Sequence, residues 1–220
     1  MLSPEEARRF YDRFGARQDR QGFYEDPPIF NLIEHAGFGE AESVFEFGCG
    51  TGKTAKILLD RYLPATARYT AVDISSTMVG LARKNLMPFG TRVGVTQSDG
   101  EMRVDAPPDR FDRFVSMYVL DLLADDDIRT LLAEAYRTLR PAGLLCLVSL
   151  THGDGFIASL VERLWRTVHA LRPSLVGGCR PIALLEYLDG TKWRIRHRRV
   201  VTAFGISSEV VIAEKPKADH

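Results

Sequence analysis

The stretch Val44-Phe-Glu-Phe-Gly-Cys-Gly-Thr-Gly-Lys-Thr-Ala55 (VFEFGCGTGKTA) joins a short apolar run to a helical pattern through three glycines at alternate positions. Glycines in such a turn let backbone N–H groups and the helix N-terminus approach a ligand. A P-loop needs a glycine at position 47, where the chain has Phe47, and the dinucleotide fingerprint needs one at position 53, where it has Lys53. Each phosphate-binding motif therefore lacks one required residue.

Two acidic residues accompany this loop. Glu46 ends the strand-like run before the glycines, and Asp73 ends the next strand-like run, Tyr69–Val72. A carboxylate at position 46 repels a pyrophosphate but attracts a ligand that carries an ammonium group. An acid about 20 residues past such a loop is placed to accept hydrogen bonds from a ribose diol. The pattern therefore favours a nucleoside ligand with a positive charge.

Strand-like and helical patterns alternate over most of the chain. The first five strands are expected at 44–47, 69–72, 93–97, 113–117 and 144–149. Such alternation predicts right-handed βαβ units and a parallel sheet with helices on both faces. Ser75 is expected to cap a helix that runs to Leu86, and Asp125–Asp127 begin a helix that Pro141 and Gly143 stop.

The end of the chain departs from this alternation. The strand-like runs 194–203 and 208–213 are joined by a short turn at 204–207. So short a connection suits an antiparallel hairpin, and the sheet is therefore expected to end with one antiparallel strand. The intervening segment contains a helical pattern at 156–171, and residues 4–36 are expected to be helical and to lie outside the core.

Length and composition limit the class of protein. The chain has 220 residues, 45% hydrophobic content and a formal net charge of zero, which predict one full-sized domain and do not favour binding of long nucleic acid. Three widely spaced cysteines argue against a disulfide framework or a metal site and favour a reducing cytoplasm. No signal-peptide pattern begins the sequence, and its apolar runs are too short to span a bilayer.

Further motifs complete a family resemblance. Gln97–Glu101 follows the third strand, Phe111–Leu123 covers the fourth, and Leu139–Gly143 resembles an LxPGG turn in which Ala142 replaces one glycine. Together with Glu46–Gly52 and Asp73, these segments resemble the class I S-adenosylmethionine (SAM) dependent methyltransferases over residues 40–150 and the final hairpin. The closest similarity is to small enzymes of the quinone-biosynthesis and phosphatidylethanolamine N-methyltransferase type.

The resemblance implies a Rossmann-like three-layer α/β sandwich with a seven-stranded, mostly parallel sheet and a C-terminal antiparallel hairpin strand. It divides the single domain into a helical lid (1–40), a SAM-binding core (41–150), a helical acceptor-site insertion (151–192) and a terminal hairpin (193–215). S-adenosylhomocysteine (SAH) would be the product, and no metal is implied. The residues assigned to the cofactor are Tyr11, Gln18, Glu46, Gly48, Cys49, Gly50, Gly52, Asp73, Ile74, Met78, Asp99, Gly100, Glu101 and Met117.

Catalytic candidates follow strands four and five, where the transferred methyl group should point. They are Tyr118, Asp121 and His152, each of which also has an ordinary structural role as an alternative. Lys53 is expected on the exposed first turn of its helix. The basic run 194–199 is either a solvated strand edge or a site for an anionic head group.

The expected reaction is transfer of a methyl group to nitrogen or oxygen of a small molecule. Positioning of the two reactants and exclusion of water would do most of the catalysis. Three alternatives remain: a methyltransferase for phospholipids or quinones at a membrane surface, a non-catalytic SAM-binding protein, and a NAD-dependent oxidoreductase that Lys53 disfavours. Peripheral membrane contact, and a monomer or homodimer, are compatible with the sequence.

Overall fold

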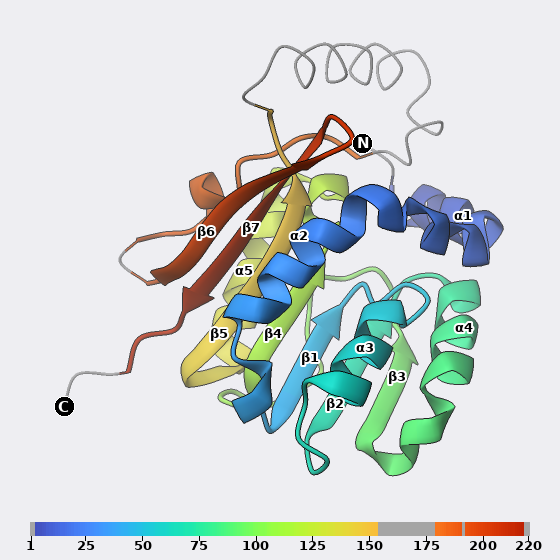
Figure 1. Cartoon of the computed structure of the whole chain (residues 1–220), viewed down its shortest axis with the longest axis horizontal. Coiled ribbons are helices and arrows are strands. Elements are labelled where there is room, and N and C mark those ends of the chain that lie inside the picture. Colours follow the sequence, from blue (N-terminus) through green and yellow to red (C-terminus); the bar gives the residue numbers. More distant parts are fainter. Residues whose placement is uncertain (1–2, 154–178, 191, 218–220) are drawn as a thin grey trace.

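The computed structural model describes residues 3–153, 179–190 and 192–217, which form one sheet covered by helices (Figure 1). The sheet has seven strands in the order β3-β2-β1-β4-β5-β7-β6. Their bounds are β1 Ser43–Phe47, β2 Arg68–Asp73, β3 Val93–Gln97, β4 Phe111–Met117, β5 Leu139–Leu150, β6 Arg194–Ala203 and β7 Ile206–Glu214. The first five strands are parallel, and β7 runs antiparallel to both of its neighbours, β5 and β6.

The hairpin and the single antiparallel strand are therefore confirmed, but β7 is not at the edge. It lies between β5 and β6, so β6 is the edge strand on this side of the sheet. The turn is tighter than the sequence predicted, because only Phe204 and Gly205 separate the two strands. Both residues have positive φ angles, 53° and 80°, which is the backbone of a two-residue type I′ turn.

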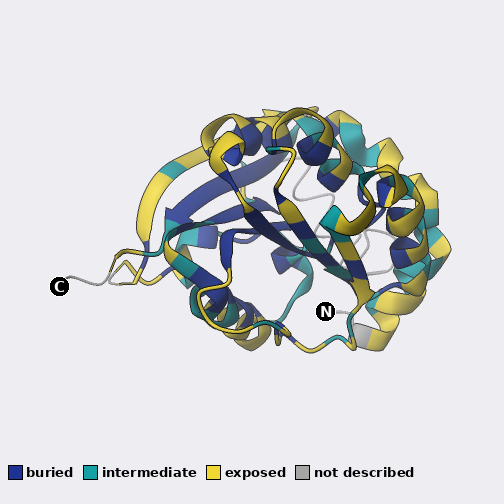
Figure 2. Ribbon diagram, turned by 90° about the horizontal axis from the view of Figure 1, so that it is seen from below, coloured by how far each residue is buried: buried dark blue, intermediate teal, exposed yellow. Residues whose placement is uncertain are grey.

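Helices cover both faces of the sheet (Figures 1 and 2). Their bounds are α1 Pro4–Phe14, α2 Gly22–His35, α3 Lys53–Arg61, α4 Ser76–Leu86 and α5 Asp125–Thr138, with 3₁₀ turns η1 Gly15–Gln21, η2 Phe38–Glu40, η3 Met87–Arg92, η4 Leu120–Leu122 and η6 Leu184–Tyr187. One core contains α2, α3 and α4 with Val44 and its neighbours, and the other contains α5 with Phe45 and its neighbours. Consecutive residues of a strand point to opposite faces, which explains how both cores share β1.

Two predicted helix boundaries are confirmed and one is shifted. Ser75 caps α4, because its hydroxyl accepts a hydrogen bond from the Met78 N–H at 3.1 Å. Asp125 begins α5 as predicted. However, α5 already ends at Thr138, and the Pro141–Gly143 segment belongs to the irregular start of β5. Strand pairing from Leu139 therefore ends the helix before the proline does.

The expectation that residues 4–36 lie outside the core is wrong for α2. Leu32 and Ile33 of α2 are almost completely buried against β5, β7 and β6. The buried Arg113 of β4 holds the C-terminal end of this helix by donating hydrogen bonds to the carbonyls of Ala36 and Gly37, both at 2.7 Å. Only α1 and η1 remain as a cover for the glycine loop. The helix predicted at 156–171 lies outside the described residues.

Candidate cofactor and acceptor site

The glycine loop between β1 and α3 has the backbone that its sequence predicts. The φ angles of Gly48, Gly50 and Gly52 are 79°, 53° and 76°, and residues other than glycine rarely adopt such angles. A Cβ atom on Gly48 would lie 2.3 Å from Cγ2 of Val119, and one on Gly50 would lie 2.8 Å from Oε1 of Gln18. The first two glycines thus bring the loop close to the segment after β4 and to η1.

Gly52 contributes to helix packing and does not line the cavities, unlike the other two glycines. It is the N-terminal cap of α3, and a Cβ atom there would lie 3.1 Å from the Ala82 Cα of α4. The absence of a side chain therefore lets α3 and α4 pack closely together. Gly52 is not among the residues that line the cavities described below.

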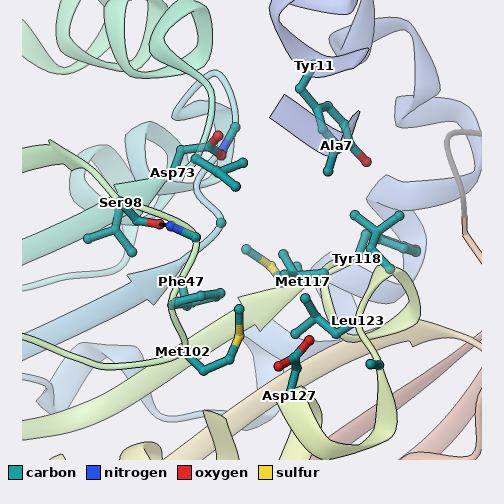
Figure 3. Close-up of a pocket in the computed structure, with 18 of the residues that line it drawn as sticks. Ala7, Tyr11, Phe47, Asp73, Ser98, Met102, Met117, Tyr118, Leu123 and Asp127 are labelled. Carbon is teal, nitrogen blue, oxygen red and sulfur yellow. Dashed lines mark hydrogen bonds between the residues drawn. The ribbon is translucent and has the colours of Figure 1, made fainter. Parts of the chain in front are cut away.

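Asp73 at the end of β2 is fixed by two backbone N–H groups. Its carboxylate accepts a hydrogen bond from the Gly50 N–H at 2.8 Å and another from the Ser75 N–H at 2.9 Å. Burial raises the pKa of this carboxyl above its usual value, and the two hydrogen bonds oppose that effect. Each oxygen keeps acceptor capacity, and Asp73 lines the cavity in Figure 3, so it can accept hydrogen bonds from a ligand's diol.

Glu46 at the end of β1 is more deeply buried than its sequence position suggests. Glu46 is only 1% exposed, and the Tyr69 hydroxyl donates a hydrogen bond to Glu46 Oε2 at 2.9 Å. Burial raises the pKa of Glu46 to about 8. The carboxyl is therefore largely protonated at neutral pH, and it ionises more readily when a cation lies beside it.

Two cavities meet at the glycine loop. The larger one lies between α1 and the carboxyl ends of the strands, as Figure 3 shows, and the smaller one lies toward α2. Both are lined by Gln18, Gly48, Gly50, Met117 and Tyr118. The larger cavity also has Tyr11, Phe47, Asp73, Ile74, Ser98, Gly100, Met102 and Asp127, and the smaller one has Glu25, Asp26, Glu46, Cys49, Thr51 and Lys53. An apolar chamber with one fixed acid therefore adjoins a smaller polar one.

Three aspartates hold the N-terminal segment over the loop, and we call them the latch: Asp12, Asp19 and Asp26, spaced seven residues apart. Asp12 accepts hydrogen bonds from the Ser75 hydroxyl at 2.6 Å and the Thr77 N–H at 3.2 Å, at the N-terminus of α4. The Ser75 bond is the main cause that lowers the pKa of Asp12.

The other two members of the latch bind the loop and α3. Asp19 accepts a hydrogen bond from the Thr51 hydroxyl at 2.7 Å, and Asp26 pairs with the Lys53 ammonium at 2.7 Å. Lys53 is therefore not a free residue on the first turn of α3, as the sequence suggested, but half-buried in an ion pair. The sequence analysis missed the latch, although its regular spacing was the available signal.

Tyr118 directly follows β4 and lines both cavities. Its φ angle is 55°, a conformation that is costly for a bulky residue and is often found at functional sites. The hydroxyl is within 3.0 Å of the Ser208 hydroxyl, and the ring packs edge-to-face on Tyr24 with centroids 6.1 Å apart. The structure thus holds this ring rigidly where the sequence placed a catalytic candidate.

Asp121 lies deeper than the sequence suggested. It is completely buried in η4, and the Cys179 thiol and the Ser149 hydroxyl lie beside its carboxylate. Burial raises the pKa of Asp121 to about 7, and the nearby Cys179 and Ser149 partly oppose this effect. A buried acid of this pKa is suited to exchange a proton near neutral pH.

Eleven of the predicted site residues line one of the two cavities: Tyr11, Gln18, Glu46, Gly48, Cys49, Gly50, Asp73, Ile74, Gly100, Met117 and Tyr118. Met78 is instead part of the buried side of α4. Asp99 and Glu101 are exposed, and the Asp99 carboxylate accepts the Glu101 N–H at 2.9 Å in a local turn. His152 is exposed, and it lines neither cavity.

The sequence analysis did not predict several lining residues. Phe47, Met102 and Leu123 supply apolar surface, and Ser98 and Asp127 supply polar groups. Met102 lies in an irregular segment whose position depends on packing against α5, as the salt bridge and backbone contacts of Glu134 and Arg137 show. No sequence pattern indicates such a contact.

The fold and this loop define a Rossmann-like α/β protein with a nucleoside site at the carboxyl ends of its parallel strands. Comparison with known proteins agrees with the resemblance that the sequence indicated. A family model described as a methyltransferase domain matches residues 44–143. The closer similarity to quinone and phosphatidylethanolamine enzymes stays a prediction.

Named relatives agree with this family. The chain is 31% identical over 157 residues to the non-reducing polyketide synthase dpmpA of Macrophomina phaseolina, covering 62% of this chain and 7% of that protein. It is 27% identical over 132 residues to the malonyl-[acyl-carrier protein] O-methyltransferase of Priestia megaterium. This match covers 60% of this chain and 44% of that protein. The chain thus spans less than half the length of these relatives.

The fold is also that of solved methyltransferases. The N-methyltransferase NodS of Bradyrhizobium japonicum, solved in complex with SAH, superposes with a TM-score of 0.72 at 18% identity, covering 96% of this chain and 99% of that one. Among the described residues, no helix is long and apolar enough to cross a membrane. The same residues contain no cluster of three or more metal-ligating side chains.

Proposed function

We propose that this protein transfers a methyl group from SAM to nitrogen or oxygen of a small molecule, an activity of the EC 2.1.1 type. The observation that carries the proposal is the fixed Asp73 carboxylate, which Gly50 and Ser75 hold in the wall of the larger cavity. The adenosine would occupy the larger cavity with its ribose on Asp73, and the methionyl group would occupy the smaller cavity.

Two features of the smaller cavity fit a ligand with an amino-acid group. The Gln18 Oε1 atom is buried without a hydrogen-bond partner among the described residues, directly over Gly50, and can accept a hydrogen bond from an ammonium group. Glu46 supplies a carboxyl that a cation would ionise. Lys53 and Thr51 line the same cavity and can bind a carboxylate.

The bound cofactor would supply a methyl group on a positively charged sulfur. The chain's own residues would orient it and exclude water: Phe47 and Met117 line the larger cavity, and Tyr11 closes it from α1 (Figure 3). Tyr118, which lines both cavities, would position the acceptor, and the buried Asp121 lines neither cavity. We assign no proton transfer to His152, because it is exposed and outside both cavities.

The membrane-surface alternative has less support. Its main feature was the basic run on β6, but Arg198 pairs with the buried Glu209 at 2.7 Å and Arg196 pairs with Glu214. These pairs fix the edge strand to β7. The names of the relatives include an O-methyltransferase and an N-methyltransferase, which support oxygen and nitrogen as candidate acceptor atoms.

Thermal melting with SAM, SAH, NAD and ATP tests the cofactor. SAM and SAH should each stabilise the protein, whereas stabilisation by NAD or ATP alone would contradict the proposal. Asp73→Ala should remove the shift caused by SAM, and the exposed Asp99→Ala should keep it. A screen for transfer of a radiolabelled methyl group then separates an enzyme from a non-catalytic SAM-binding protein, which would bind SAM but label no acceptor.

A further inference from the structure

The larger cavity has two acidic residues in its wall, Asp73 and Asp127. Within the described part of the chain, they are the only charged residues that line it. Figure 3 shows them on opposite sides of the cavity, with Phe47 and Met102 between them in this view. Because Asp73 is the proposed partner of the ribose, Asp127 faces the part of the nucleoside that lies farther along the cavity.

The carboxylate of Asp127 is not used by the fold. Asp127 is the third residue of α5, and it has no hydrogen bond or ion pair with any residue that the structure describes. Its neighbour Asp125 differs, because it accepts a hydrogen bond from the Tyr187 hydroxyl at 2.8 Å and pairs with Arg180. Of the three aspartates that begin α5, only Asp127 lines a cavity. Its oxygens are therefore available to a ligand.

The cavity wall near the two acids suits a flat base. Val72, Ile74, Met102 and Leu123 all contribute apolar side chains to it. Aliphatic groups and a thioether pack well on an aromatic ring, but they have no strong donor or acceptor that distinguishes one purine from another. Discrimination between bases must therefore come from a polar group at the edge of the base.

The segment after β3 does not supply this polar group. The Asp99 carboxylate accepts the Glu101 N–H at 2.9 Å, and Asp99 lines neither cavity. Gly100 lines the larger cavity, but it donates its N–H to the Ser98 hydroxyl at 3.1 Å. A hydroxyl can both donate and accept, so Ser98 does not by itself distinguish an amine from a carbonyl. An ionised aspartate only accepts, which leaves Asp127 as the selective group.

We propose that Asp127 accepts a hydrogen bond from the exocyclic amine of adenine and so selects the base of the cofactor. This inference rests on the proposed function, because it takes the adenosine of SAM to occupy the larger cavity. The amine is at the end of adenine opposite the ribose, as Asp127 is opposite Asp73 (Figure 3). A hydrogen bond to a carboxylate is stronger than one between neutral groups.

A base with a carbonyl group at this position does not suit Asp127. Hypoxanthine has an oxygen where adenine has its amine, so two acceptors would face each other without a proton to share. Asp127 lies in the first turn of α5, where the helix dipole favours a negative charge. The site should therefore prefer adenine to hypoxanthine even though the two bases have nearly the same shape.

Calorimetric binding of SAH and S-inosylhomocysteine to the full chain tests this preference, because the two ligands differ only in the base. We expect SAH to bind about tenfold more tightly, as the loss of a hydrogen bond to a charged group would give. Equal affinities, or tighter binding of S-inosylhomocysteine, would overturn the proposal.

Two neighbouring variants assign the preference to one side chain. In Asp127→Asn the amide can present either its oxygen or its NH₂ group, so S-inosylhomocysteine should bind more tightly than to the unmodified chain and the preference should fall below threefold. Asp126→Asn is the matched control, because it removes the same charge from the same turn but lines neither cavity. It should keep the tenfold preference.

The gain in affinity for S-inosylhomocysteine separates a role in specificity from a structural role, since damage to the fold would weaken binding of both ligands. A preference that is unchanged in Asp127→Asn, or reduced equally in Asp126→Asn, would overturn the assignment. Failure of the unmodified chain to bind SAH would contradict the proposed function together with this inference. SAH binding without any preference between the bases would overturn only the role of Asp127.

Discussion

The two walls of the cofactor site are built in different ways. The wall formed by the strand ends and the glycine loop depends on backbone: Gly48 and Cys49 donate their N–H groups to the Val72 carbonyl at 2.9 and 3.0 Å. The opposite wall, formed by α1 and η1, is held by two side chains of the latch: Asp12 of α1 binds Ser75 before α4, and Asp19 of η1 binds Thr51 of the loop. The first wall cannot move without loss of the fold, whereas the second can separate by breaking a few polar contacts.

The largest effect should come from the backbone wall. In Gly48→Ala the new Cβ atom would lie 2.3 Å from Val119 and the backbone would be strained at a φ of 79°. Left-handed strain and overpacking each cost about 1–3 kcal/mol, so SAM affinity measured by calorimetry should fall by roughly 30-fold or more. The control is Gly80→Ala, where the added Cβ atom meets nothing within 4 Å. Equal affinity in both variants would show that the loop is not a tight cradle.

A smaller loss of SAM affinity is expected from Asp73→Asn, which keeps the size of the side chain but removes its charge. Hydrogen bonds to a charged group contribute about 1.5–3 kcal/mol, so the SAM dissociation constant should rise roughly tenfold to 100-fold. Asp99→Asn should leave it unchanged, since Asp99 is exposed in a local turn. If Asp99→Asn had the larger effect, the ribose would have to be assigned to the segment after β3.

The pH dependence of cofactor binding should reveal Glu46. Its pKa of about 8 in the ligand-free protein lies above the ordinary 4.5, so bringing a cation beside it releases a proton. SAM affinity should therefore rise from pH 6 to pH 8, by at most about tenfold per unit, and Glu46→Gln should flatten the profile. The same shift means that Glu46 reduces the stability of the ligand-free protein as pH rises from 4.5 toward 8. A profile that is unchanged by Glu46→Gln would remove Glu46 from the site.

Substitutions in the latch should have the smallest effect on cofactor affinity and a clearer effect on the rate of SAH dissociation. Asp12→Ala removes the contacts with Ser75 and Thr77, and Asp19→Ala removes the contact with Thr51. One hydrogen bond contributes about 0.5–1.5 kcal/mol, so SAH dissociation in stopped flow should become roughly twofold to tenfold faster.

Asp60→Ala is the matched control for the latch, because it removes an ion pair of similar length, 2.6 Å to Lys56, away from the site. Its SAH dissociation rate should equal that of the unmodified chain. If the latch variants behaved in the same way as this control, α1 and η1 would be as fixed as the glycine loop, and the contrast between the two walls would disappear.

Much of this site could be predicted from local sequence. Gly48, Gly50 and Asp73 were recognised because positive φ angles restrict the residue type and because strand ends follow from hydrophobic patterns. Tyr11 and Gln18 were reached only through the family resemblance. Asp99 was placed in the site by the same resemblance, but its carboxylate instead closes a local turn.

The remaining features depend on contacts between distant segments. The sequence by itself determined the alternation of strands and helices and the turn that needs glycine, since steric limits and periodicity within a few residues set both. Only the tertiary structure decided that α2 belongs to the core, that Lys53 pairs with Asp26, and that Glu25 lines the smaller cavity. These three features depend on burial and on neighbouring charges, and both are created by residues that lie far apart in the chain.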